Sequence, residues 1–206
     1  NSGTIANKTG GNLTITGWVD AVPANPRTDL VTFNLAGATA THTFQAEVGR
    51  SIIINTAMSG DGGFEKTGDG ILDLRAGNSY TGNTTVSAGT LKLTNASSSN
   101  PIASSPTVTV TSPAVLDVSG LSGGTLTLAA GQTLQGTGTV NGTLNLGGGT
   151  LRPGTSVGDL TTGPAFSGTG STYVAELGPG LSSDTWIVAG LLDLSASGDI
   201  LDIQLL

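Results

Sequence analysis

Apolar and polar positions alternate along the chain in short triplets. Each triplet reads apolar, polar, apolar, as in Leu72-Asp73-Leu74 and Leu91-Lys92-Leu93. Alternation at period two places the two outer residues on one face of a strand and the middle residue on the other. Because every middle residue is Thr, Asn, Asp or Lys, we expect that second face to lie in water. The other triplets occupy residues 13–15, 33–35, 108–110, 116–118, 126–128, 144–146, 192–194 and 201–203.

The spacing of the triplets predicts a solenoid. From Leu13, successive triplets begin 20, 39, 19, 17, 8, 10 and 18 positions apart. Steps near 20, and twice that step, indicate one coil for each ~20 residues. Glycine-rich corners such as Gly123-Gly124-Thr125 separate the triplets and supply the positive φ of tight turns. We therefore expect about nine or ten coils, with little or no helix because no segment combines a sustained helical period with caps.

The predicted fold is all-β, a parallel β-helix whose stacked coils share one interior. A β-sandwich also has short strands and frequent turns. The aromatic share of only 4% and the shortness of the strands favour the β-helix. A single coil is too short to bury a core, whereas stacking produces one continuous interior.

Composition and charge exclude several classes of partner. The formal net charge is −7 with only seven Lys plus Arg, and no basic stretch exists, so we expect neither nucleic acid nor an anionic membrane surface as a partner. No apolar run approaches ~18 residues, so we expect no membrane-spanning segment. The absence of cysteine excludes disulfides, thiolate metal sites and cysteine nucleophiles.

Both ends of the chain resemble strands. Residues 2–5 and 200–206 are strand-like, and no amphipathic capping helix flanks either of them. Natural solenoids cap their ends because unpaired strand edges recruit other strands. We therefore expect self-association through the ends of the β-helix. The chain begins at Asn1 without a signal-peptide pattern, so we expect a mature or excised chain. Because it ends directly after a core strand, we expect either a fragment or a chain whose last coil is completed by another molecule.

A longer motif occupies residues 59–93, and it closely resembles the autotransporter-associated β-strand repeat of bacterial passenger domains. Residues 151–160 resemble the Pro-Gly-x-Ser-x-Gly-x-Leu turn that follows in the same proteins, and 170–177 with 184–194 resemble their late coils. The matching residues of the motif are Gly62-Gly63-Phe64, Lys66-Thr67-Gly68, Leu72, Leu74, Asn78, Tyr80-Thr81-Gly82, Thr84-Thr85-Val86 and Gly89-Thr90-Leu91.

The resemblance implies a right-handed parallel β-helix that is exported and displayed or released outside a bacterial cell. Such repeats usually build shafts, with function carried by insertions. We divide the chain into N-terminal coils at 1–58, the β-strand-repeat β-helix at 59–160 and C-terminal coils at 161–206, which continue or are completed by another molecule.

Three groups of polar residues are candidates for chemical sites. His42, the only histidine, lies in an alternating stretch and is interpreted as an exposed strand residue. Asp61, Glu65, Asp69 and Asp73 carry the carboxylates that calcium prefers, but their Gly-Asp-Gly copies are not in tandem, so we interpret them as turn residues. Asp73, Asp117, Asp193 and Asp202 share the middle triplet position, and glycoside cleavage needs two close carboxylates. We interpret this last set as a solvated outer face.

The scattered aromatics are interpreted as partial core or end caps, although aromatic rings also stack on sugars. They are Trp18, Tyr80, Tyr173 and Trp186. We assign no catalytic, cofactor-binding or metal-binding residue and expect no cofactor.

Three functions remain as hypotheses. The first is a non-enzymatic extracellular structural protein, a surface shaft or fibre subunit that associates head-to-tail into filaments. The second is an adhesin that binds a surface glycan or protein through the long loops at 22–27 and 95–106. The third is a carbohydrate-active enzyme on a β-helix.

Overall fold

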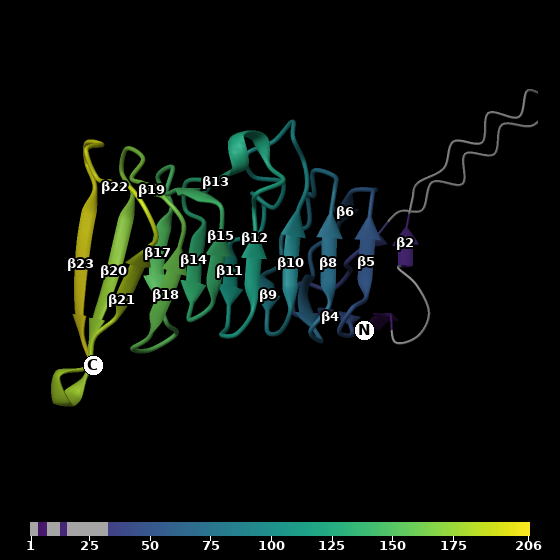
Figure 1. Ribbon diagram of the computed structural model, residues 1–206, viewed down its shortest axis with the longest axis horizontal. Coiled ribbons are helices and arrows are strands. Elements are labelled where there is room, and N and C mark those ends of the chain that lie inside the picture. Colours follow the sequence, from purple (N-terminus) through teal and green to yellow (C-terminus); the bar gives the residue numbers. More distant parts are fainter. Residues whose placement is uncertain (1–3, 8–12, 16–32) are drawn as a thin grey trace, which may run out of the picture.

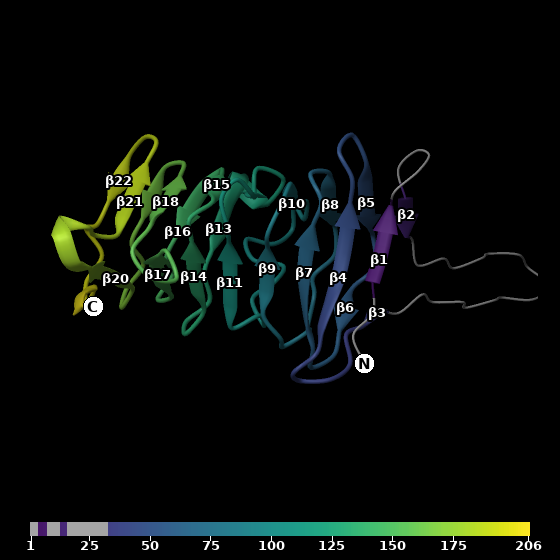
Figure 2. The same cartoon turned by 90° about the horizontal axis from the view of Figure 1, so that it is seen from below.

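The protein is a rod of stacked coils. The computed structural model describes residues 4–7, 13–15 and 33–206. The strands follow one another along the long axis, with the earliest described strands at one end and β23 (Ile200–Leu205) at the other (Figures 1 and 2). Every pairing between named strands is parallel within this part of the chain, which confirms the predicted parallel β-helix. The right-handed sense of the coil stays a prediction.

The largest sheet, here called sheet 1, runs the length of the rod with nine strands. Its order follows the sequence, so each strand pairs with its equivalents in the coils before and after it. In order, the strands are β1 (Thr4–Asn7), β4 (Thr41–Ala46), β7 (Gly63–Thr67), β9 (Thr84–Val86), β11 (Thr107–Val110), β14 (Thr133–Gly136), β17 (Thr150–Pro153), β20 (Thr172–Leu177) and β23.

A second sheet of eight strands, here called sheet 2, forms another side of the coil. The next strand after each strand of sheet 1, except the last, lies in this sheet. Its strands are β2 (Leu13–Ile15), β5 (Ser51–Ile54), β8 (Ile71–Leu74), β10 (Thr90–Leu93), β12 (Val115–Asp117), β15 (Thr139–Asn141), β18 (Asp159–Thr162) and β21 (Thr185–Val188).

The third side of the coil is less regular. It holds a two-stranded sheet of β3 (Phe33–Asn34) and β6 (Met58–Ser59), and a four-stranded sheet, here called sheet 3. In the described residues, helix is limited to two 3₁₀ turns, η1 (Ser122–Gly124) and η2 (Pro179–Leu181), as expected. The strands of sheet 3 are β13 (Thr125–Thr127), β16 (Thr143–Asn145), β19 (Ala165–Phe166) and β22 (Leu192–Asp193).

The solenoid has about seven turns, slightly fewer than the nine or ten that the sequence predicted. Equivalent strands of sheet 1 begin at Thr41 and, seven turns later, at Ile200, so a turn averages about 23 residues rather than ~20. The triplets that begin at Val108, Leu116 and Leu126 lie in sheets 1, 2 and 3 of one turn. Triplets therefore mark sides of a coil as well as whole coils, and their spacing overestimated the coil count.

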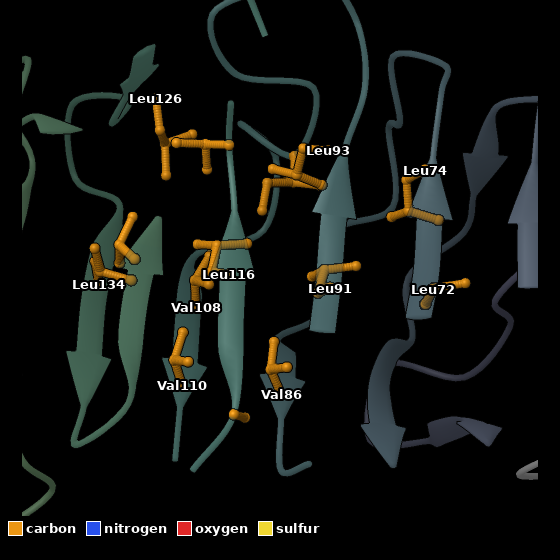
Figure 3. Packing of buried hydrophobic residues seen from close by; sticks show 14 of the residues in the cluster. Leu72, Leu74, Val86, Leu91, Leu93, Val108, Val110, Leu116, Leu126 and Leu134 are labelled. Carbon is orange, nitrogen blue, oxygen red and sulfur yellow. The ribbon is translucent and has the colours of Figure 1, made fainter. Parts of the chain in front are cut away.

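Aliphatic columns fill the interior. Leu72 pairs in register with Leu91, and Leu91 with Leu116, so the first residues of three triplets stack directly on one another. All three side chains are fully buried, and Figure 3 shows them between the sheets with their neighbours. The cluster continues from Leu35 to Ala165. Each coil thus buries the inward side chains of the one before it, which is where the hydrophobic stabilisation of the rod arises.

Tight stacking also limits the corners between sheets. Gly68 has φ +72°, a left-handed conformation that glycine adopts readily, and the amide of the nearby Gly70 donates to the Ala46 carbonyl of the preceding coil at 2.8 Å. A Cβ at Gly68 would collide with the same Ala46 carbonyl oxygen. The glycine is therefore required both by its backbone angle and by the closeness of the neighbouring coil.

The proposed division at residues 58 and 160 stays a prediction. The sheets run on past both positions, since β4 pairs with β7 across the first and β18 contains the second.

Candidate functional site

The four acidic residues considered for calcium lie on different parts of the coil. Asp61 Oδ1 accepts a hydrogen bond from the Gly37 amide at 2.6 Å, and Glu65 accepts one from Ser87 Oγ. Asp73 lies on sheet 2 and forms an ion pair of 2.8 Å with Arg75. In the described part of the chain, no three His, Asp or Glu side chains are placed to hold a metal ion together.

The recurrent triplet aspartates are likewise dispersed over the three sheets. Asp73 and Asp117 lie on sheet 2 with Lys92 between them in register, and Lys92 Nζ is 3.9 Å from an Asp117 carboxylate oxygen. Asp193 lies on sheet 3 and Asp202 on sheet 1. Lys92 separates Asp73 from Asp117, and the other two carboxylates lie on different sheets. These four residues therefore include no facing pair of carboxylates of the kind that glycoside cleavage uses.

His42 is half-buried, and the expectation of an exposed strand residue was wrong. It pairs in register with Phe64, which is fully buried, so the two residues occupy the same column of sheet 1. The alternation Thr41-His42-Thr43-Phe44 predicts which residues share a face but does not say which face is inward at an end of the strand.

The described aromatic residues divide between core and end. Tyr80 is fully buried and packs edge-on against Phe64 with ring centroids 5.4 Å apart. Its hydroxyl is 2.6 Å from Thr84 Oγ1, and burial raises the Tyr80 pKa well above its usual range. Tyr173 and Trp186 form a tilted pair near the C-terminal end, with ring centroids 5.8 Å apart. Trp18 lies outside the described residues.

The loop at 95–106, considered for adhesion, is fastened to the rod. Asn100 Nδ2 donates to Gln132 Oε1 at 2.7 Å, and Gln132 Nε2 donates to the carbonyls of Ile102 and Ser105. The exposed positions of the loop are Ala, Ser and Pro, which offer neither charge nor an aromatic ring to a ligand. The other candidate loop, 22–27, lies outside the described residues.

Lys66 is a buried charged group that the sequence pattern did not single out. It stands in a column of sheet 1 between Phe44 and Val86, and it is fully buried. Its ammonium donates to the carbonyls of Thr67, Gly68 and Ala88 at 2.9, 2.7 and 3.1 Å. Burial lowers the Lys66 pKa to about 8, opposed by the charges of Asp69 and Glu47. These contacts join two consecutive coils, so the lysine has a structural role.

A buried acidic pair near the last turns was also missed. Glu176 is buried and its Oε1 forms an ion pair with Arg152. Asp184 accepts hydrogen bonds from the amides of Gly158 and Glu176 at 2.9 and 2.8 Å, and burial raises its pKa. Both carboxylates are engaged in fastening the turn around η2. No hydrophobic alternation marks them, so the sequence pattern held no signal for this cluster.

The most distinctive surface is the C-terminal end of the rod. Here the inward residues of β23 face open space: Leu201, Ile203 and Leu205 are 62%, 57% and 82% exposed. A mainly apolar cavity of about 520 Å³ opens beside them and is lined in part by Tyr173 and Trp186. Ten of the twelve exposed large hydrophobic side chains of the described residues lie in this region: Leu177, Ile187, Leu191, Leu192, Leu194, Ile200, Leu201, Ile203, Leu205 and Leu206.

Comparison with known proteins finds a match to one family model. Residues 64–93 match the passenger-associated-transport-repeat, in the segment that forms β7 to β10. No curated protein matches the chain, and no solved structure does. Among the described residues, none of the helices is long and apolar enough to cross a bilayer. The repeat and the stacked parallel coils match those of an autotransporter passenger-like β-helix repeat protein.

Proposed function

We propose that the chain is a non-catalytic structural protein of the cell surface or extracellular space, where it serves as a shaft or fibre subunit. The observation that carries this proposal is the uninterrupted stacking of about seven turns on a single core. A solenoid of this kind is stiff along its axis because each coil is hydrogen-bonded to both neighbours along parallel strands.

The passenger-type repeat supports an extracellular location. It accounts for β7 to β10, and the coils on either side continue the same sheets. The outward positions of these strands are polar, as in the Thr85–Thr109 pair of sheet 1 and the Lys92–Asp117 pair of sheet 2. A polar exterior and an aliphatic interior suit a rod that remains extended in water.

We also propose that the rods associate end to end. Among the residues whose burial the structure describes, the exposed large apolar side chains are concentrated at the C-terminal end of the rod and few lie along its sides. Exposed apolar patches and unpaired strand edges mark surfaces at which proteins associate. Adhesion through loops and glycoside cleavage have no comparable support in the described residues.

Immunogold electron microscopy of producing cells tests the proposal. We expect the label outside the cell on extended material, and deletion of the gene should remove that material. A strain that produces the chain with Lys92→Gln, a change on the outer face, is the matched control and should look like the parent. Label confined to the cytoplasm, or unchanged surface material after deletion, would contradict the structural role.

A further inference from the structure

We propose that a set of buried polar side chains at one corner of the coil fixes the register in which successive strands of sheet 1 stack. These side chains, here called the corner network, belong to Tyr80, Thr84, Ser105 and Gln132, and all four are buried. They lie where the chain enters sheet 1, at the start of β9 or shortly before β9, β11 and β14. The inference goes beyond the shaft proposal, because it concerns how the coils of one rod find their places.

The apolar columns do not specify the register by themselves. In sheet 1, Thr84 pairs with Val108 and Val86 pairs with Val110, and Figure 3 shows these three valines in the interior. A shift of β9 by two residues would keep every side chain on its own face and would pair Val86 with Val108. The observed register instead places a threonine against Val108, so contact between aliphatic side chains is not what selects it.

A chain of hydroxyl groups joins β9 to the turn before β11. The Tyr80 hydroxyl is 2.6 Å from Thr84 Oγ1, and Thr84 Oγ1 is 3.0 Å from Ser105 Oγ. Ser105 Oγ donates to the Thr107 carbonyl at 3.3 Å, so each hydroxyl in the chain has a partner to which it can donate. A two-residue shift would move Thr84 by ~7 Å along the strand and leave these hydroxyls unpaired in the interior, which is costly.

Gln132 makes the corresponding connection between the next two turns. Its Nε2 donates to the carbonyls of Ile102 and Ser105 at 3.0 and 2.8 Å. Its Oε1 accepts hydrogen bonds from Asn100 Nδ2 at 2.7 Å and from the Ala129 amide at 3.2 Å. The two donors and two acceptor sites of this buried amide are therefore all used. The turn that leads into β14 is held against the turn that leads into β11.

The corner network differs from coil to coil, whereas the aliphatic columns do not. Leu72 and Leu91 are the same residue in successive coils. Thr84, Ser105 and Gln132 are three different residues in successive coils, so a shifted coil would meet the wrong polar partner. Buried polar groups that are paired in only one arrangement can select that arrangement against its competitors. The corner network thus contributes more to the choice of register than to stability.

Disulfide trapping distinguishes the two registers, because the chain has no cysteine of its own. The pair Thr85→Cys and Thr109→Cys reports the observed register, in which these outward residues are neighbours. The pair Thr85→Cys and Thr107→Cys reports the two-residue shift, because in the observed register its residues are diagonal neighbours roughly 7–8 Å apart, beyond easy disulfide reach. Each protein is unfolded in urea, refolded and oxidised gently. We expect the first pair to form at least about ten-fold more disulfide than the second.

Two substitutions at Thr84 separate the hydroxyl from the packing. Thr84→Val keeps the shape and removes the hydroxyl, and it should raise the yield of the shifted disulfide at least about five-fold. Thr84→Ser keeps the hydroxyl and should stay within about two-fold of the parent. A packing role alone predicts the opposite order, since only serine leaves a cavity. Thr133→Val removes a threonine hydroxyl from the outward face of the same sheet and is the matched control, also expected within about two-fold.

A double variant covers the case in which Thr84→Val fails to fold by circular dichroism. Tyr80→Phe with Thr84→Val removes both hydroxyls, so neither is left unpaired, and it should show the same five-fold rise of the shifted disulfide. Unchanged selectivity in the valine variants, or a larger rise with Thr84→Ser, would overturn the proposal. Failure of the double variant to fold would also overturn it, because the network would then supply stability instead of register. None of these outcomes affects the shaft proposal, which depends on the immunogold experiment.

Discussion

The middle of the rod and its C-terminal end share one sequence pattern but differ in burial. In β10, the triplet Leu91-Lys92-Leu93 has both leucines fully buried. In β23, Leu201-Asp202-Ile203 has the same alternation and the same parallel partner on one side, yet both inward residues are more than half exposed. The difference lies in the neighbouring coil, because β10 has a strand on each side and β23 has one.

The comparison shows that a solenoid residue is buried by the coil that follows it. Whether a position in a repeat protein is buried therefore depends on two successive coils, as expected when each coil is stabilised mainly by its nearest neighbours. Substitutions at a stacked position and at its unstacked equivalent should accordingly have different effects on stability.

The largest contrast is expected between two leucines in one column. Leu151→Ala removes a fully buried side chain between Leu134 and Tyr173 and should lower the free energy of unfolding by about 2–5 kcal/mol. Leu201→Ala in dilute protein should cost less than about 1 kcal/mol, because the side chain is already exposed. Urea denaturation measures both, and equal losses would contradict the stacking explanation.

A second contrast concerns two glycines with similar backbone angles. Gly180 has φ +74°, and beyond its chain neighbours no heavy atom lies within 4 Å of the position that a Cβ would take. Gly180→Ala should therefore cost about 1–2 kcal/mol for the left-handed conformation alone. Gly68→Ala should cost more, because its Cβ would also collide with the Ala46 carbonyl. Thermal unfolding of the two variants distinguishes them, and a larger loss for Gly180→Ala would show that coil contact is not the controlling factor.

The third prediction compares the buried Lys66 with a variant that has no ammonium. Above a folded-state pKa of about 8, the folded protein loses this proton while the unfolded chain keeps it up to about pH 10.4. The free energy of unfolding should therefore rise between about pH 8 and 9.5, by up to about 1.4 kcal/mol per pH unit, relative to Lys66→Met. Denaturation at several pH values measures the slope. Parallel curves for the two proteins would contradict the assigned pKa.

The smallest effect is expected on the outer face of sheet 2. Lys92 is partly exposed and its Nζ is 3.9 Å from the Asp117 carboxylate, so Lys92→Ala should change the free energy of unfolding by less than about 1 kcal/mol. The same urea titrations that measure Leu151→Ala provide the value. A loss comparable to that of Leu151→Ala would show that outer ladders, and not the interior, stabilise the rod.

Much of the fold could be predicted because alternation and parallel stacking act on the same residues. The triplets at Leu72, Leu91 and Leu116 meet in register, as the coil hypothesis required. The number of turns could not be read from the pattern, because strands on all three sides carry the same triplet. Only the pairing of the strands shows to which sheet, and to which stacked column within that sheet, a triplet belongs.

At the candidate site, the sequence predicted the strand at 200–206 but not the buried charged side chains. The alternation at 200–206 predicted a strand, and the structure forms β23 there with exposed leucines and isoleucines. Lys66 and Glu176 were not anticipated, because each charged side chain is buried among groups distant in sequence, namely the Ala88 carbonyl and Arg152. The His42 error has the same origin, since only pairing with Phe64 shows which way that end of the strand faces.

Residue-resolved hydrogen exchange on dilute protein tests most directly whether each coil is protected by its successor. We predict slow exchange for the amides of β8, β10 and β12, and fast exchange for those of β23, with protection of β23 rising as the protein concentration increases. Equal protection of β10 and β23 in a dilute monomer would contradict the claim that each coil is protected by its successor.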